Sequence, residues 1–490
     1  MFFPRRLLSV TLLASCALAS QLFSLVPAQA ETLEGAVSAA LNYHPQVETA
    51  QAGLEAALYG EEAQRSGYFP ELSFSATGGR VFGDNSTSRG LSVSRGTGYS
   101  YLWEGSGTLR QPLFDGFETT NRVESAHAKK EAAEMDLASV REDLALRAAQ
   151  SYTNVMRVRA ALALLHRHEE KVGAYLKRIK TALEDGAADD AEYQKARDVQ
   201  ALLEGIIADY EGQAQAADAE YLQLTGHLPE GALMQPPLYS DSLPETPEEA
   251  VSKALESHPA LQAAARNAES LSYDVSAEEA RLYPALDGEL SYLKSDKADI
   301  IGGELVDARA VVRMSWNFET GGAQLARIKG SKQEYREALS RRQEAQRRVS
   351  QQVRLAFARY ETALKQFEIQ EKRRALNAQL LETYKVQFEG ARVRVLDLMQ
   401  AENQLFNTEL DKLNSKYRAL GAHYGVLAGM GLLQDTITAD HRGTLPAQEE
   451  ARMSEPVSAP VSAPVYGPQI EEAMLEETAL EAVQGEGGAR

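Results

Sequence analysis

The chain contains two copies of one long segment, 214 residues apart. Residues 31–72 align with residues 245–286 without a gap, and 16 of the 42 aligned pairs are identical. A copy of this length exceeds the units of about 20–50 residues that build solenoids and propellers. The sequence therefore predicts two similar halves in one chain, at 31–229 and 246–430, joined by a linker at 230–245.

The two ends of the chain differ in composition from these halves. Residues 1–30 combine a basic start, an apolar run and a final Ala28-Gln29-Ala30, which is the pattern of a secretory signal peptide cleaved after Ala30. Lipoprotein-type cleavage at Cys16, the only cysteine of the sequence, is the alternative. Residues 431–490 are Pro-rich and acidic, which predicts a disordered tail.

Charge and hydropathy exclude several classes of protein. The formal net charge is −19, so the chain lacks the basic footprint of a nucleic-acid-binding protein. After the signal peptide, no run of about 20 apolar residues could form a transmembrane helix. If this chain crosses a membrane, the sequence predicts that it does so as a closed β-barrel.

Two stretches contain no proline, the residue that breaks helix interiors. They cover about 119–226 and about 322–429, and both are rich in residues that favour helices. Gly186 and Gly390 divide each stretch into a predicted helix of about 65 residues and a second of about 40. Because a helix of about 65 residues is about 100 Å long, it needs partner helices along its whole length, as in a coiled coil.

Between the short and the long helices of each half, apolar and polar residues alternate with the period of a β-strand. The predicted hairpins cover about 71–114 and about 285–318. Alternation of this kind with interspersed aromatic residues is typical of a membrane-barrel wall. A soluble hairpin with one buried face has the same pattern, so this alternative stays open.

Four aromatic residues of the hairpins are predicted to form a belt at the membrane surface: Tyr99, Tyr101, Trp103 and Trp316. The two tryptophans are expected at equivalent places in the two return arms. Four strands cannot close a membrane barrel, so several copies must pool their strands, and three copies supply twelve. The predicted fold is mainly α, with long coiled-coil helices forming a periplasmic α-barrel and four strands per chain contributing to a trimeric twelve-stranded β-barrel.

Together these features resemble the TolC family of outer-membrane channel proteins, which serve type I secretion and efflux. The resemblance is carried by Gly186 to Arg197, by Gly390 to Leu405, and by the helix endings Leu224-Thr225-Gly226 and Leu427-Ala428-Gly429. It implies a homotrimer held in outer-membrane lipid, with a long periplasmic extension. It also implies a passive channel that docks with a periplasmic adaptor (membrane fusion protein) and an inner-membrane ABC or RND transporter.

The resemblance further assigns residues at the periplasmic tips of the helix pairs. The turns that would dock the adaptor contain Gly186, Ala187, Gly390 and Ala391. The residues that would form the gate are Glu192, Arg197, Arg392, Asp397 and Gln400. Asp397 matches an acidic ring, Gln400 stands where the family can carry a second acid, and Arg392 is expected to form a latch with Glu192, within the chain or between subunits.

The transported substrate stays open between two possibilities. Residues 166–175, together with the first tip, favour type I protein secretion. Efflux of small molecules is the alternative. A third possibility, from another class, is an exported coiled-coil structural protein, but such a protein needs neither hairpins nor a half-length repeat.

No enzyme activity, metal or other cofactor is predicted. The sequence lacks a Gly-rich phosphate loop and a nucleophile motif. His166 and His168 lie in a His-Arg-His-Glu-Glu cluster, but residues two apart on a helix face different sides, so a solvated patch is expected. His44 and His258 each precede a proline at a helix break and are expected to be local caps.

Overall fold

The computed structural model describes residues 31–83, 98–229, 231–239, 242–296, 304–390 and 392–438. The expected signal peptide, including Cys16, lies outside these residues, and so do Ala391 and residues 439–490 of the predicted tail. The prediction that the tail is disordered from 431 onward was wrong for residues 433–438, which form a helix whose Leu433 and Ile437 side chains are buried. The side chain of Tyr99 is also outside the described part, although its backbone belongs to a strand.

The two halves contain the same elements in the same order. The first half has α1 (Leu33–Tyr43), α2 (Pro45–Arg65), a short 3-10 helix η1 (Ser66–Tyr68), β1 (Glu71–Gly83), β2 (Gly98–Phe114), α4 (Glu118–Glu184) and α5 (Asp190–Thr225). The second half has α6 (Pro247–Ser257), α7 (Pro259–Ala280), β3 (Ala285–Asp296), β4 (Glu304–Ser315), α8 (Ala323–Glu389) and α9 (Val395–Met430), followed by α10 (Leu433–Thr438). α4 and α8 have 67 residues each, and α5 and α9 have 36 each, so corresponding helices match in length.

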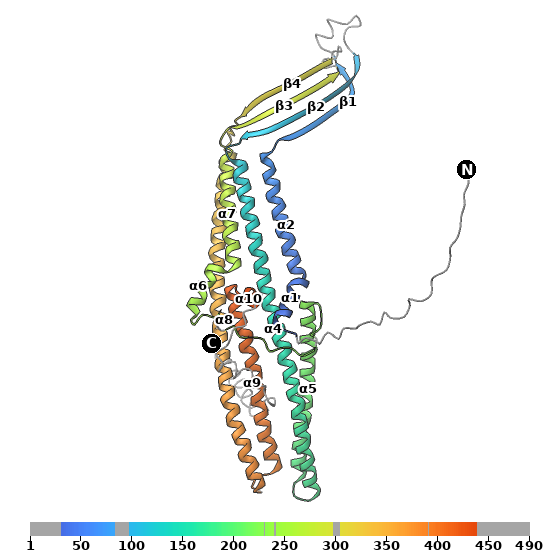
Figure 1. The fold of residues 1–490 in the computed structure, drawn as a ribbon, viewed down its shortest axis with the longest axis vertical. Helices are drawn as coiled ribbons and strands as arrows, with labels where there is room; N and C mark the ends of the chain where they lie inside the picture. Colours follow the sequence, from blue (N-terminus) through green and yellow to red (C-terminus); the bar gives the residue numbers. More distant parts are fainter. Residues whose placement is uncertain are drawn as a thin grey trace, which may run out of the picture.

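The molecule is strongly elongated, with the sheet at one end and two helical hairpins at the other (Figure 1). α4 and α8 run the whole length of the helical body, about 100 Å at about 1.5 Å per residue. α2 and α7 accompany them near the sheet, whereas α5 and α9 accompany them near the opposite end. The mainly helical fold with long paired helices is therefore confirmed. Among the described residues, no helix is both long and apolar enough to cross a membrane.

The helix breaks before Pro45 and Pro259 depend on the two histidines that precede these prolines. The Nδ1 atoms of His44 and His258 accept hydrogen bonds from the backbone N–H groups of Gln46 (3.3 Å) and Ala260 (3.2 Å). Each histidine thus caps the helix that follows, because it satisfies an N–H group that has no partner within the helix. The prediction that both are local caps is confirmed.

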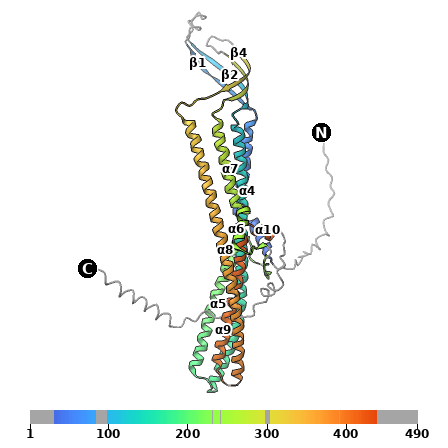
Figure 2. The same cartoon turned by 90° about the vertical axis from the view of Figure 1, so that its left-hand side faces the viewer.

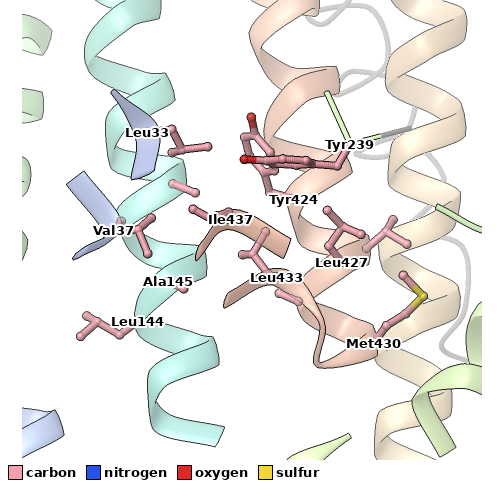
Figure 3. Close-up of a cluster of buried hydrophobic side chains, with 14 of the residues drawn as sticks. Leu33, Val37, Leu144, Ala145, Tyr239, Tyr424, Leu427, Met430, Leu433 and Ile437 are labelled. Carbon is pink, nitrogen blue, oxygen red and sulfur yellow. The ribbon is translucent and has the colours of Figure 1, made fainter. Parts of the chain in front are cut away.

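The largest hydrophobic cluster lies halfway along the helical body, where the two halves meet. Figure 3 shows some of its side chains. Leu33 and Val37 of α1 contribute to it together with Leu144 of α4, Tyr424 of α9 and Leu433 of α10. Burying side chains of this size stabilises the fold by about 1.5–3 kcal/mol each before entropy is counted. This cluster holds the short helices against the long ones.

The segment 231–239 after α5 lies across α9, and we call it the strap. The hydroxyl of Tyr424 donates to the carbonyl of Pro237 (2.7 Å), and Nζ of Lys416 donates to Oε1 of Gln235 (3.1 Å). The backbone N–H of Tyr239 donates to Nε2 of His423 (3.2 Å). α10 projects from one side of the helical body (Figure 2) and belongs to the same cluster as Tyr239 of the strap. One face of α9 is therefore covered by the strap.

The four strands form one antiparallel sheet in the order β1-β2-β3-β4, so each half contributes one hairpin. The register places Leu72, Leu109, Leu290 and Ala310 in one cross-strand row. Residues in such a row point to the same face of a sheet, and the face alternates with every residue.

One face of the sheet is apolar and the other is polar. The apolar face includes Phe74, Tyr101 and Val312, which are 78%, 71% and 69% exposed. The opposite face carries charged pairs between strands. Arg110 Nη2 lies 2.7 Å from Asp287 Oδ2, and Arg313 Nη2 lies 2.8 Å from Glu289 Oε2. An exposed apolar sheet face of this extent indicates contact with lipid or another protein.

Candidate functional site

The end of the molecule opposite the sheet consists of two tips, the turn from α4 to α5 and the turn from α8 to α9 (Figure 1). In the first tip, Gly186 has φ +74°, a conformation that residues with a Cβ adopt only with strain. Asp189 then caps α5, since its Oδ1 accepts from the backbone N–H of Glu192 (2.7 Å). Gly186 and Ala187 are exposed.

The second tip is built differently. Gly390 is exposed but has φ −81°, which other residues adopt without strain. The N–H of Arg392 donates to the carbonyl of Gln387 (2.9 Å), and the N–H of Arg394 donates to Oδ2 of Asp397 (2.9 Å). Asp397, predicted from the resemblance to belong to an acidic ring, thus caps its own helix.

One ion pair joins the two tips. Glu192 of α5 is 8% exposed and pairs with the guanidinium of Arg394 at the start of α9. The sequence predicted Arg392 as this partner, but within the chain the partner is Arg394, because the turn after α8 places residue 394 rather than residue 392 beside Glu192 of α5. A latch from Arg392 to another subunit stays a prediction. Arg197 and Gln400 are exposed in a single chain.

Beside this ion pair, a small apolar cluster packs the two helical hairpins together. Ile179 of α4, Ala196 of α5, and Leu396 and Met399 of α9 are buried in it. Because members come from both hairpins, the two tips form one unit within a chain. Movement of one tip relative to the other would have to break this contact.

Further from the tips, a polar seam runs between α4 and α9. His168 is 1% exposed, its ring stacks on Phe406 with centroids 3.5 Å apart, and its Nε2 lies 2.8 Å from Asn403 Oδ1. Burial lowers the pKa of His168 to about 3, so it is neutral at physiological pH. The prediction of a solvated patch at this position was wrong for His168, since tertiary packing of α9 covers it.

Lys171 and Glu402 continue the same seam with an ion pair of 2.5 Å, although Glu402 is only 5% exposed. These residues were not singled out from the sequence. The sequence signal that could have indicated this buried ion pair was the presence of charged residues on the apolar stripe of a predicted long helix. Within the described residues, no cluster of three or more His, Cys, Asp or Glu side chains could hold a metal ion.

The two tryptophans lie at opposite ends of the sheet. Trp103 pairs with Gly78 and with Asp296, the last residue of β3, close to the hairpin loops. Trp316 follows the end of β4 near the helices, and its Nε1 donates to the carbonyl of Leu282 (3.1 Å). The expectation of equivalent positions was wrong, because Trp103 stands eleven residues before the end of β2 whereas Trp316 directly follows the last residue of β4.

The distance between the two tryptophans along the sheet can be compared with the thickness of a membrane. About twelve residues of strand at about 3.3 Å per residue span about 40 Å. With a strand tilt of about 45°, this corresponds to about 28 Å along the membrane normal, close to the apolar band of about 25 Å in membrane barrels. Tyr101 and Trp103 are both exposed on the apolar face near one end.

Comparison with known proteins identifies this architecture. The sequence profile described as outer membrane efflux protein matches residues 36–227 and 250–431, which is most of both halves. The outer membrane efflux protein BepC of Brucella suis biovar 1 (strain 1330) is 25% identical over 433 residues, covering 86% of this chain and 89% of that protein.

Solved structures share the fold. A membrane protein from Pseudomonas aeruginosa matches with a TM-score of 0.71 at 19% identity, covering 81% of this chain and 93% of that one. The CmeC outer membrane channel of Campylobacter jejuni matches with a TM-score of 0.70 at 15% identity, covering 86% and 89%. The open state of the MtrE outer membrane channel of Neisseria gonorrhoeae matches with a TM-score of 0.68 at 16% identity, covering 82% and 89%.

Proposed function

Because the chain belongs to the outer membrane efflux protein family, we propose that it is the outer-membrane exit duct of a tripartite export machine. In this function it carries substrate passively from an inner-membrane transporter across the periplasm and the outer membrane. The observation that carries the proposal is the two-ended structure. A sheet with an exposed apolar face stands at one end, and a helical body of about 100 Å leads from it to charged tips at the other.

The two edges of the chain support a homotrimer. α8 lies at one edge of the helical body along its whole length. α5 lies at the other edge near the tips (Figure 1). α8 exposes an apolar stripe of Ile369, Leu376 and Leu380, at 44–64% exposure. Identical chains that join one edge to the opposite edge of the next copy form a ring when the rotation between copies closes.

Charge supports the same contact. α8 contains fifteen Lys and Arg against eight Asp and Glu, whereas α5 contains eight acids against two bases. Contact between the basic edge of one copy and the acidic edge of the next is electrostatically complementary. Three copies would also pool their strands into a twelve-stranded barrel whose apolar face meets lipid.

The tips are the proposed docking surface for a periplasmic adaptor and, through it, an ABC or RND transporter. Gly186, Ala187 and Gly390 are exposed at the end of the molecule that is furthest from the sheet. Because the Glu192–Arg394 ion pair and the apolar cluster around Met399 tie the two hairpins together, adaptor binding that breaks both contacts would free the tips to move apart.

Type I protein secretion is the proposed traffic, supported by the sequence of residues 166–175 and of the first tip. Efflux of small molecules is the second candidate, favoured by the efflux protein BepC as a relative. Deleting the gene separates the two. Loss of a secreted protein without a change in drug sensitivity supports the first, and the opposite result supports the second.

Purification tests the duct itself. The protein is expected to require detergent for extraction, to migrate as a trimer and to form conducting channels in planar bilayers. A monomer extracted in buffer without detergent, with no channel activity, would indicate a periplasmic coiled-coil protein instead.

A further inference from the structure

A groove of about 1090 Å³ crosses the middle of the helical body between α4 and α8. Its floor is the C-terminal part of α9, where Gly421 and Gly425 have no side chains that would fill the groove. Three arginines line it, Arg348 and Arg359 from α8 and Arg418 from α9. A concentration of arginines in one groove is notable because the chain as a whole has a net charge of −19.

The groove and the strap lie on opposite faces of α9. Lys416 and His423 contact the strap. Arg418 and Gly425 each follow one of these residues by two positions, which is a rotation of about 200° around a helix with 3.6 residues per turn. Both line the groove. The same helix therefore shows one face to the strap and the other to the groove.

In a closed ring of three chains, the strap side faces outward. Three straps, with the copies of α1, α6 and α10 beside them, would otherwise occupy the space inside the tube. The groove consequently opens into the duct. This step rests on the proposed function, because without a ring the groove has no inner side.

The arginines of the groove retain most of their positive charge. Arg359 is exposed and makes no ion pair with any residue that the structure describes. Nη1 of Arg418 donates to the neutral amide of Gln366 (2.8 Å). Arg348 pairs with Glu344 at 3.2 Å, but both side chains are at least 68% exposed, and such pairs interact weakly in water.

The two acids in the groove do not offset this charge. Asp143 pairs with Arg147 at 3.3 Å. Glu142 is 6% exposed, and its two carboxylate oxygens accept the backbone N–H groups of Leu433 (2.6 Å) and Gln434 (2.9 Å). Its carboxylate is therefore directed toward α10, away from a solute in the groove.

We propose that this groove is an anion-attracting station on the inner wall of the duct. Arg348, Arg359 and Arg418 of each copy form a basic ring that favours solutes carrying carboxylate or phosphate groups over cations. Rings of Arg and Lys select anions in other pores, and clefts with one sign of charge raise the local concentration of the opposite sign. The small residues of α9 leave room for the solute beside the ring.

Reversal potentials in planar bilayers under a KCl gradient test the proposal, with chloride as the probe anion. Arg348→Gln combined with Arg359→Gln removes two exposed charges that do not support the fold. The control is Arg347→Gln combined with Arg354→Gln, which removes the same charge from the same helix but in another hollow, beside Leu255 of α6.

The groove variant is expected to lower the ratio of chloride to potassium permeability at least about two-fold, and more at 0.1 M than at 1 M salt, because the Debye length falls from about 10 Å to about 3 Å. The control is expected to leave the ratio within that limit. An unchanged ratio in the groove variant, or an equal change in the control, overturns the proposal. A wild-type protein that forms no channel overturns the proposed function instead.

Thiol labelling locates the groove independently. Cys16 is the only cysteine and lies in the expected signal peptide, so Arg359→Cys introduces a single target into the processed chain. A bulky thiol reagent is expected to reduce the conductance of Arg359→Cys channels and to leave Arg354→Cys channels unchanged. Equal block of both variants, or of neither, contradicts the placement of the groove inside the duct.

Discussion

Single residues show how the two halves are held in one arrangement. Glu192 is almost buried and is paired with Arg394 from the other half of the chain. His423 is buried between the strap and neighbouring aromatic rings of Tyr360 and Tyr424. In both cases one polar side chain contacts a segment far away in the sequence, so its replacement affects a contact between elements.

Replacing Arg394 is expected to loosen the tips. Arg394→Ala removes the only ion-pair partner of Glu192 among the described residues. Because the side chain of Arg394 is exposed to solvent, the loss of this ion pair is expected to change the free energy of unfolding by only about 1 kcal/mol. Single-channel conductance or open probability is therefore expected to rise without a large fall in Tm. Arg392→Ala, two residues away, is the matched control, and an equal rise in that variant would favour a latch between subunits.

The second prediction at this scale concerns acid stability. Burial lowers the pKa of His423 to about 4, and its Nε2 accepts the N–H of Tyr239, so protonation would break this bond. The unfolded chain binds the proton near pH 6.5, so the contribution of neutral His423 to stability is complete above that pH and is lost as pH falls toward 4.

His423→Gln keeps a possible acceptor for Tyr239 but cannot titrate. Melting temperatures of the detergent-solubilised protein between pH 7 and pH 4 are expected to fall less for this variant than for the wild type. The difference corresponds to at most about 3 kcal/mol, from about 1.4 kcal/mol per pKa unit. Identical pH profiles would show that His423 does not control acid stability.

At the scale of elements, the two tips are equivalent in position but use different turns. The first needs the positive φ of Gly186, and the second ends α8 at Gly390 with an ordinary negative φ. The second tip is instead stabilised by Asp397, whose Oδ2 accepts the backbone N–H of Arg394 (2.9 Å) and lies 3.7 Å from Nε of the same arginine. The duplicated hairpins have therefore kept their length while their turns differ.

Glycine replacements at the tips are expected to have unequal effects. Gly186→Ala forces a Cβ into a left-handed conformation, at a cost of about 1–2 kcal/mol. Gly390→Ala meets no atom closer than 3.5 Å and keeps an allowed φ, so it is expected to be nearly neutral. Hydrogen exchange or limited proteolysis at the two tips measures the local effect. Faster exchange at the second tip in Gly390→Ala would contradict this explanation.

At the scale of the whole molecule, the proposed trimer depends on a contact between chains. The apolar stripe of α8 has no partner of its own within the described chain at Ile369 and Leu376, which are 54% and 64% exposed. These residues lie where the next copy would pack. A large exposed apolar stripe on such a long helix is otherwise unfavourable in water.

Ile369→Glu combined with Leu376→Glu is therefore expected to abolish the trimer, because two charges would be buried between copies without partners. Light scattering of the detergent-solubilised protein after size-exclusion chromatography measures the mass. Leu228→Glu, at a residue 55% exposed before the strap, is the control and is expected to stay trimeric. A trimer that persists in the double variant would place the contact elsewhere.

Much of this architecture could be predicted from the sequence, because the features that specify it are local. The absence of proline over more than 100 residues predicts the long helices, and the period-two alternation predicts the strands. The repeat predicts two equivalent halves, and the His-Pro pairs predict the helix breaks. Each of these depends on backbone propensity or on the spacing of neighbouring residues, which a linear sequence contains in full.

The tertiary structure alone decided which distant residues meet. It paired Glu192 with Arg394 rather than Arg392, buried His168 under Phe406, and separated Trp103 from Trp316 along the sheet. It also placed three arginines in one groove, on the face of α9 opposite the strap. Such contacts depend on the relative rotation and height of helices that lie far apart in sequence, where a shift of one or two residues changes the partner. Local spacing contains no information on these relative positions.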